Sequence, residues 1–247
     1  FINRVDFEKA WSIYKDRFSN AGDFTFFFVG AFTVEEITPY IEKYLANLPN
    51  TNRDETFKDV FKKFPEKTID FSIKKGIDNK GMLGIIFNEE FPYNDQNILN
   101  LSLISDVISI KAIEIIREKM SGVYSPQIQI QIEKYPTSSY TLMAMFSCDP
   151  KMEKKITKAI MKIIADIQKN GPTLEDLNKV KEQTLRERET QVKTNEFWMH
   201  KLGQISFNGD PVSNVTTFNQ RVKDVTVEDL KKTAQQYIKK DHFVRVT

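Results

Sequence analysis

The segment 96–120 constrains the fold more than any other part of the sequence. Its apolar residues keep helical spacing, yet they point in almost every direction around the helix. A helix that is apolar on all sides has to be buried on more than one face. We therefore expect this helix to lie at the centre of a sizeable core. Its apolar residues are Leu99, Leu101, Leu103, Ile104, Val107, Ile108, Ile110, Ile113, Ile115 and Ile116.

Strand patterns occur on both sides of this helix. Residues 127–133, QIQIQIE, alternate strictly, which is typical of a strand with one face in water. Residues 138–147 predict its hairpin partner, and the aromatic run at 23–31, DFTFFFVGA, predicts a buried strand. Further strands are expected near 67–75, 81–88 and 242–247.

Helical periodicity predicts most of the remaining elements. Thr33 and Glu36 have the spacing of a capping box, so a helix should begin there and end before Pro49. Pro39 lies inside that helix and should cost it a hydrogen bond or a kink. Other helices are expected at 6–18 and near 151–169, 174–195 and 227–239, with a helical stretch around 196–222.

Composition narrows the class of protein. The 247 residues are 40% hydrophobic and 28% charged, a balance that suits a globular protein. The formal net charge of +2 gives no reason to expect nucleic acid or an anionic membrane as a partner. No apolar run reaches the length of a membrane span. Because the chain opens without Met and without a signal-peptide pattern, we interpret it as a segment of a longer protein.

The sequence offers little for metal or nucleophilic chemistry. Its two histidines, His200 and His242, lie in neither of the paired-histidine motifs that hold a catalytic zinc. We interpret both as partly buried structural residues. Cys148 is the only cysteine, so no internal disulfide or thiolate cluster can form, and we interpret it as a buried thiol. The phosphate-binding loops and the nucleophile elbow are also absent.

One pair of residues remains as a candidate site. Arg117 ends the long apolar helix, and Tyr124 enters the alternating strand seven positions later. Arg can donate two parallel hydrogen bonds to a carbonyl or carboxylate. A Tyr hydroxyl can donate to an oxyanion. The residues alone leave an ordinary interpretation open, since Arg is favoured at any helix C-terminus and Tyr is common at the start of a strand.

Two parts of the chain resemble each other. Residues 5–18 lead into DFTFFFV, and residues 225–238 lead into HFVRV. We interpret both as Val, acid, helix, aromatic or aliphatic stop, then strand. Either helix-then-strand units simply look alike, or the chain is one unit of a tandem array.

Three segments resemble the pitrilysin/insulinase family of zinc peptidases, and specifically its C-terminal-type domain. They are FTFFFVGAFTVEEITPYIEKYLANLP, IIREKMSGVYSP and GPTLEDLNKVKEQ, and they occur in the family's order across nearly the whole chain. The resemblance implies a repeated α+β domain in a clamshell peptidase. We therefore expect an α+β fold, with a mixed, mainly antiparallel sheet and helices on one face. Residues 1–22 would connect from a preceding domain, and 23–247 would form the zinc-free domain.

The resemblance also implies roles. Zinc would be bound outside this segment, by a peptidase domain of the same chain or of a partner subunit. This segment would close over a peptide substrate and be inactive alone. Arg117 would hold a substrate carbonyl oxygen, and Tyr124 would support the oxyanion. A non-catalytic scaffold or assembly subunit of the same fold remains an alternative, as does a peptide-binding module that adds a strand to an open sheet edge. The sequence leaves the compartment open, with the periplasm or cell envelope favoured.

Overall fold

The computed structural model describes residues 4–51, 53, 55–60, 63–75, 80–120 and 126–247. The chain divides into two compact units. Unit 1 comprises Phe1–Lys58 and Gln191–Asp210, and unit 2 comprises Asp59–Thr190 and Pro211–Thr247.

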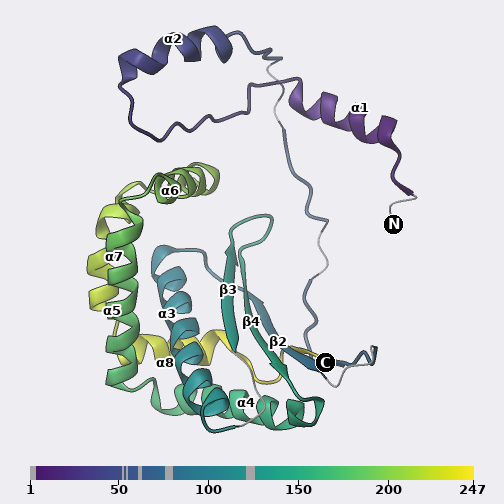
Figure 1. The fold of residues 1–247 in the computed structure, drawn as a ribbon, viewed down its shortest axis with the longest axis vertical. Helices are drawn as coiled ribbons and strands as arrows, with labels where there is room; N and C mark the ends of the chain where they lie inside the picture. Colours follow the sequence, from purple (N-terminus) through teal and green to yellow (C-terminus); the bar gives the residue numbers. More distant parts are fainter. Residues whose placement is uncertain (1–3, 52, 54, 61–62, 76–79, 121–125) are drawn as a thin grey trace. The chain divides into compact units, whose positions relative to one another are not determined.

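Unit 2 is built on one sheet of five strands, in the order β1-β5-β2-β4-β3 (Figure 1). Strands β2, β4 and β3 are antiparallel neighbours, and β5 is antiparallel to β2 but parallel to β1. The prediction of a mixed, mainly antiparallel sheet is therefore confirmed. The strands are β1 (Ile69–Phe71), β2 (Gly81–Glu90), β3 (Gln127–Glu133), β4 (Ser139–Cys148) and β5 (Val244–Val246).

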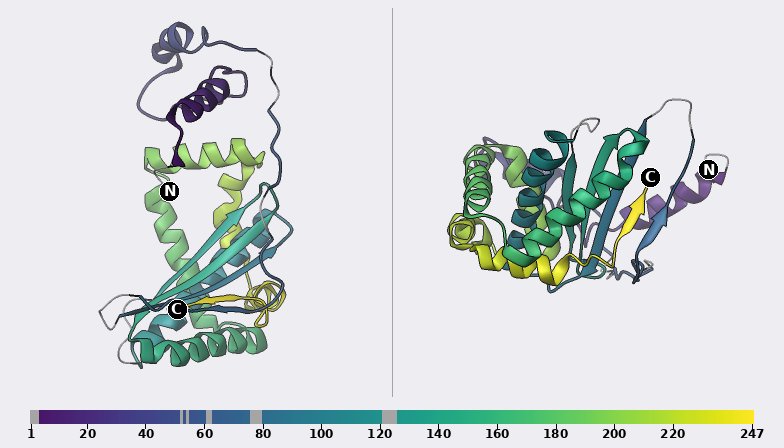
Figure 2. Two further views of the ribbon diagram at one scale, coloured as in Figure 1. Left: turned by 90° about the vertical axis from the view of Figure 1, so that its right-hand side faces the viewer. Right: turned by 90° about the horizontal axis from the view of Figure 1, so that it is seen from below.

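The two long strands bury alternate residues on one face. On β2, Leu83, Ile85 and Phe87 are almost fully buried, and every second residue of β4 from Tyr140 onwards is buried too. Helices cover this face, and Figure 2 shows them on one side of the sheet. The period of two thus separates a core face from an open face.

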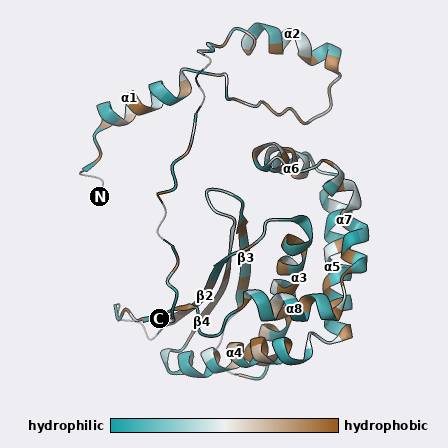
Figure 3. Ribbon diagram, turned by 180° about the vertical axis from the view of Figure 1, so that it is seen from behind, coloured by the Kyte–Doolittle hydropathy of each residue, from teal (hydrophilic) through white to brown (hydrophobic). Residues whose placement is uncertain are grey.

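The central helix is α3 (Asp95–Ala112), whose first turn is capped by the Asn94 side chain. Nine of its 18 residues are buried, and Ile108 is only 1% exposed. Apolar residues occur along its whole length (Figure 3). The prediction of a helix buried on more than one side is confirmed, although the α-helix ends earlier than residue 120. A π-helical turn, η2 (Ile113–Arg117), continues it.

The other helices of unit 2 complete the apolar layer. They contribute Ile, Leu and Val side chains that pack in the same core cluster as α3. Gly171 ends α4 with φ +76°, and a Cβ there would lie 2.7 Å from Val227, so the corner requires glycine. The helices are η3 (Pro150–Met152), α4 (Glu153–Asn170), α5 (Leu174–Gln191), α7 (Ser213–Asp224) and α8 (Val227–Tyr237).

Unit 1 contains α1 (Phe7–Phe18), α2 (Val34–Tyr44) and α6 (Asn195–Asn208). The predicted capping box between Thr33 and Glu36 is present at the start of α2. Neither α1 nor α2 buries a residue. A buried side chain, Asn20, joins the loop after α1 to residues after α2, because its Oδ1 accepts a hydrogen bond from the Thr51 N–H at 2.8 Å.

The predicted buried strand at 23–31 is wrong. These residues have irregular backbone, and Phe24, Phe26 and Phe28 are exposed. A strand is stable only when neighbouring backbone completes its hydrogen bonds. The sheet in the described part of the chain consists of β1 to β5 and includes no strand from this segment. The structure also groups residues 23–58 with 1–22, so the domain boundary that we expected after residue 22 stays a prediction.

Candidate functional site

Arg117 lies at a distinctive point of the backbone. It is the last residue of η2, where the N–H of Glu118 donates to the Ile113 carbonyl at 3.1 Å, five residues back. Turns of this kind are rare, and they occur often at functional sites. Ile116 before it is buried, whereas Arg117 itself is exposed. The turn therefore fixes the backbone in the core and leaves the guanidinium open to a ligand.

Tyr124, the second predicted site residue, lies outside the described residues, between η2 and β3. Its proximity to Arg117 stays a prediction. Before this gap the described chain forms α3 and then η2, and after it the chain forms β3.

Strand β3 lies at one edge of the sheet. It pairs with β4 from Gln127 opposite Met145 to Glu133 opposite Ser139, and β4 is its one neighbour among the described strands. An edge strand presents a row of backbone N–H and C=O groups that can pair with an extended segment. Its exposure alternates as the sequence predicted, with Gln127, Gln129 and Gln131 outward.

The alternate residues of β3, which face the helices, hold this edge strand in place. Ile128, Ile130 and Ile132 are half-buried and pack against the core cluster on the helix side. The strand is thus held on one face by packing and on one edge by β4. Its other edge and its glutamine face are chemically suited to a peptide backbone and to polar side chains.

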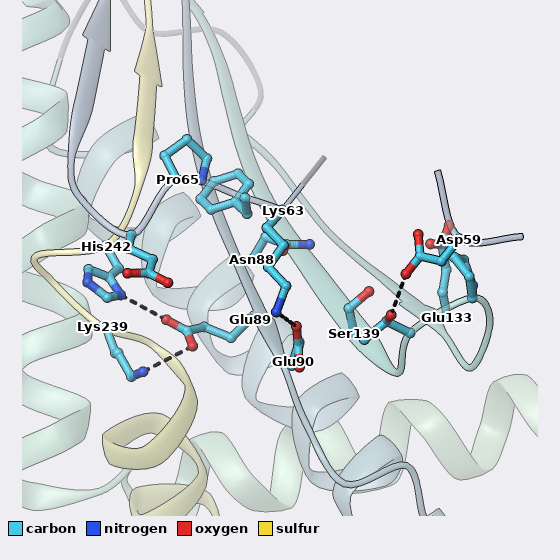
Figure 4. A pocket seen from close by; sticks show the side chains of 14 residues that line it. Asp59, Lys63, Pro65, Asn88, Glu89, Glu90, Glu133, Ser139, Lys239 and His242 are labelled. Carbon is cyan, nitrogen blue, oxygen red and sulfur yellow. Dashed lines mark hydrogen bonds and ion pairs between the residues drawn. The ribbon is translucent and has the colours of Figure 1, made fainter. Parts of the chain in front are cut away.

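A pocket of about 540 Å³ lies at the hairpin end of the sheet (Figure 4). Its walls come from the ends of β2 and β3, the β3–β4 hairpin, the segment after residue 58, and the region between α8 and β5. Figure 4 shows carboxylates and bases facing each other across it. They include Glu89, Glu90, Glu133, Lys63, Lys239 and His242.

Both lysines of this pocket form ion pairs with its carboxylates. Glu89 accepts from Lys239 Nζ at 3.0 Å and lies 3.1 Å from His242 Nδ1. Lys63 lies 3.2 Å from Glu90. Because Glu89 and His242 are 153 positions apart, neither spacing nor composition signals this pair. Our interpretation of His242 as a partly buried structural residue agrees with its contact to Glu89. The same interpretation is wrong for His200, whose side chain is 80% exposed.

The described residues do not fit a zinc site. They contain no group of three or more His, Cys, Asp or Glu side chains that could hold a metal ion. His200 is exposed and lies 3.9 Å from Glu196. Cys148 is buried, and burial, followed by the charges of Glu153 and Asp149, raises the pKa of its thiol. We therefore derive no step of a reaction through a metal in this chain.

Two carboxyl groups on or beside α3, Asp106 and Asp176, were not among the residues predicted from the sequence. Surrounding protein and then Glu187 raise the pKa of Asp106 to about 6, although its side chain is open to solvent. Asp176 is 2% exposed and lies 2.9 Å from Lys111 Nζ. Burial alone would raise the pKa of Asp176, but hydrogen bonds from Thr173 and Lys111 lower it. For Asp176, a polar residue at a core position was the available signal.

Sequence comparison decides the family. A model of the family described as the Peptidase M16 inactive domain matches residues 4–184. The chain belongs to this family. Within the described residues of this M16 inactive domain, no helix is long and apolar enough to cross a membrane.

Two curated relatives are named as zinc proteases. The domain is 23% identical over 216 residues to "Zinc protease PQQL-like" of Arabidopsis thaliana, covering 81% of this chain and 22% of that protein. It is 26% identical over 161 residues to "Probable zinc protease PqqL" of Haemophilus influenzae, covering 60% of this chain and 16% of that protein. The chain thus spans about a fifth of the curated relatives that it matches.

Solved structures share the fold of this M16 inactive domain. The periplasmic protease PqqL from Escherichia coli has a TM-score of 0.73 at 14% identity, covering 88% of this chain and 24% of that one. A protease from Helicobacter pylori has a TM-score of 0.70 at 15% identity, and the match covers 88% of this chain and 53% of that one. A mutant of the ferredoxin protease FusC, in complex with Arabidopsis ferredoxin, has a TM-score of 0.71 at 12% identity. That match covers 87% of this chain and 23% of the other. At these identities the likeness concerns the fold.

Proposed function

We propose that this chain is the zinc-free half of a zinc-dependent endopeptidase. It closes over an extended peptide and holds it for hydrolysis by a zinc-bearing domain outside these 247 residues. The observation that carries the proposal is the open edge of β3, which follows closely on the exposed Arg117 in the chain. The zinc-protease names of its relatives support the parent activity.

In this proposal the peptide lies beside β3 as an added strand. Backbone hydrogen bonds to the edge hold any extended sequence, which suits a peptidase that accepts varied substrates. Arg117 binds a peptide carbonyl oxygen, and Tyr124 donates to the oxyanion that forms during attack. The zinc-bearing domain, in the same chain or a partner subunit, supplies the activated water.

A scaffold or assembly subunit of the same fold is the second candidate. The family's description as an inactive domain favours it, since such a domain needs a partner for any chemistry. The periplasmic relative supports the periplasm or cell envelope as the compartment.

Peptide binding to the 247-residue chain in EDTA tests the proposal. The probes are one alternating, unstructured peptide and two forms that carry backbone N-methyl groups on its odd or its even residues. An added strand uses the N–H groups of one edge, so one methylated form should bind on the order of 10-fold or more weakly, at about 1 kcal/mol per lost hydrogen bond. The other form should bind like the parent.

Three outcomes would count against the proposal. If both methylated forms bind like the parent peptide, strand addition at β3 is wrong. If the parent peptide itself does not bind, the scaffold becomes the better-supported function. Cleavage of the peptide in EDTA would contradict the assignment of hydrolysis to a zinc-bearing domain.

A further inference from the structure

The outer face of α4 carries a row of lysines. Six lysines lie between the turn η3 and the end of α4, and all six are exposed. Within α4, which the structure describes in full, Asp166 is the one exposed acidic residue. We call these six lysines the lysine stripe. They are Lys151, Lys154, Lys155, Lys158, Lys162 and Lys169.

Helix geometry explains why the lysines share one side. Helix α4 lies at the outside of unit 2, beside α3 and α8 (Figure 1). Its inner side packs into the core cluster through Ile156, Ile160, Ile163, Ile164 and Ile167. The stripe follows the opposite side at intervals of three and four residues, the spacing of one helix face. From residue 151 to residue 169 it runs about 27 Å, at a helical rise of about 1.5 Å per residue.

The placement of these lysines does not serve the stability of α4. Lys158 lies four residues from both Lys154 and Lys162, and like charges at this spacing weaken a helix. Lys154 and Lys155 also lie in the first turn, where the helix dipole favours acidic residues. Among the described residues, no carboxylate forms an ion pair with the stripe. An arrangement that costs the helix stability and has no counter-charge in the described chain indicates an anionic partner.

The next helix shows the usual alternative. On α5, Lys179 pairs with Glu175 and Arg186 with Glu182, each four residues earlier, so these charges cancel. The formal net charge of +2 averages such segments with the lysine stripe. A local excess of positive charge on α4 is therefore hidden in the composition of the chain.

We propose that the lysine stripe binds the anionic headgroups of a lipid membrane. The apolar side of α4 is buried in its own domain, so the helix lies on the headgroups and does not insert. Because the helices cover one face of the sheet, docking through α4 leaves the open face turned away from the membrane (Figure 2). The inference stands apart from the proposed function, because it uses neither Arg117 nor the edge of β3.

Side-chain chemistry favours a lipid surface over an acidic protein or a nucleic acid. The energetic centres of protein interfaces are enriched in Trp, Tyr and Arg, whereas Lys is depleted there. Surfaces for single-stranded nucleic acid combine basic charge with aromatic side chains that stack on bases. Over residues 150–170, all of which the structure describes, the exposed positions include neither Arg nor an aromatic residue. Ammonium groups on flexible stems suit a fluid layer of headgroups, which offers charge without fixed geometry.

Cosedimentation of the 247-residue chain with vesicles tests the proposal. One set of vesicles contains phosphatidylcholine alone, and the other contains phosphatidylcholine and phosphatidylglycerol in about equal amounts. We expect the chain to bind only the anionic vesicles at about 0.1 M NaCl. Binding should be lost at about 1 M NaCl, because the Debye length falls from about 10 Å to about 3 Å.

A matched pair of triple variants locates the binding surface. Replacing Lys155, Lys158 and Lys162 together by Gln should weaken binding on the order of 100-fold, since each lysine near an anionic surface contributes about fivefold. The control removes the same charge from three exposed lysines outside α4 and should bind nearly like the parent chain. Its substitutions are Lys58→Gln, Lys193→Gln and Lys223→Gln.

Two further measurements guard against an unfolded variant. The Tm of the α4 variant should not fall below that of the parent chain, because the substitutions remove like-charge pairs. In the parent chain, anionic vesicles should slow the acetylation of the stripe several-fold, as measured by mass spectrometry. Lys223, which is exposed on α7, is the internal control and should react at the same rate with and without vesicles.

Three results would overturn the inference. The first is a lack of binding to anionic vesicles, and binding of polyglutamate or duplex DNA in their place would assign the stripe to an acidic protein or a nucleic acid. The second is equal binding to both kinds of vesicle. The third is equal weakening in the two triple variants, which would assign binding to net charge alone. Failure of peptide binding at β3 would leave the inference intact.

Discussion

At the scale of single residues, Arg117 and Tyr124 should affect different kinetic constants of the parent enzyme. Arg117→Lys should raise KM with little change in kcat, because Lys cannot make the planar two-pronged contact. Tyr124→Phe should lower kcat by about 10²–10³-fold, the usual loss for one oxyanion donor. Steady-state kinetics on an unstructured peptide measures both.

The control is Arg186→Lys on α5, where an exposed Arg pairs with Glu182 on the same helix. It should leave both constants unchanged. If the Arg117 and Tyr124 variants also behave like the parent while all remain folded, the clamp is wrong and the scaffold function gains support.

Asp106 should make stability depend on pH. Its pKa is about 6 in the folded chain, above the ordinary 3.8 of an Asp side chain, so the folded state binds its proton more tightly. Protonation of Asp106 stabilises the folded state fully below about pH 4, and this stabilisation is lost as the pH rises through about 6. Asp106→Asn should therefore raise Tm at pH 7.5 by about 1–2 °C, since solvent screening keeps the penalty small.

Thermal unfolding at pH 4 and pH 7.5 checks this expectation. Asp166→Asn, which removes the same charge from an exposed position of α4, is the matched control and should show no such pH dependence. If Asp106→Asn raised Tm equally at both pH values, the raised pKa of Asp106 would not be the cause.

At the scale of elements, α3 should dominate stability. Ile108 is 1% exposed in the core cluster, so Ile108→Ala should lower the free energy of unfolding by about 2–5 kcal/mol. Val60→Ala, at an exposed site, should cost less than about 0.5 kcal/mol. Urea denaturation measures both, and an unchanged midpoint for Ile108→Ala would show that the helix is not central.

Elements with a complete local signal were predictable from the sequence. Strict alternation gave β3 at 127–133, and the capping residues gave the start of α2 at Thr33. The segment 23–31 has an equally strong strand composition but no partner strand in the described chain. The π turn at η2 was not predictable, because a run of Ile residues suits an α-helix as well. Periodicity indicates which secondary structure a segment can form, whereas strand pairing also requires a partner strand elsewhere in the fold.

At the scale of the whole molecule, the candidate site was only partly predictable. Arg117 was identified because the resemblance assigns it a role, and the structure shows it exposed at the end of a rigid element. The pocket at the hairpin end was not, since the partners of Glu89 come from positions 239 and 242. Contacts between residues so distant in the chain leave no trace in spacing or composition.

The position of β5 also has a consequence for biosynthesis. Strands β2, β4 and β3 can pair as soon as residues 81–148 have left the ribosome. Strand β1 is made earlier, yet it pairs only with β5 among the described strands, and Ile69 lies opposite Val244. Strand β1 must therefore wait for its partner through the synthesis of more than half of these 247 residues. During this interval the nascent protein exposes an unpaired strand, and strand edges of this kind are prone to aggregation.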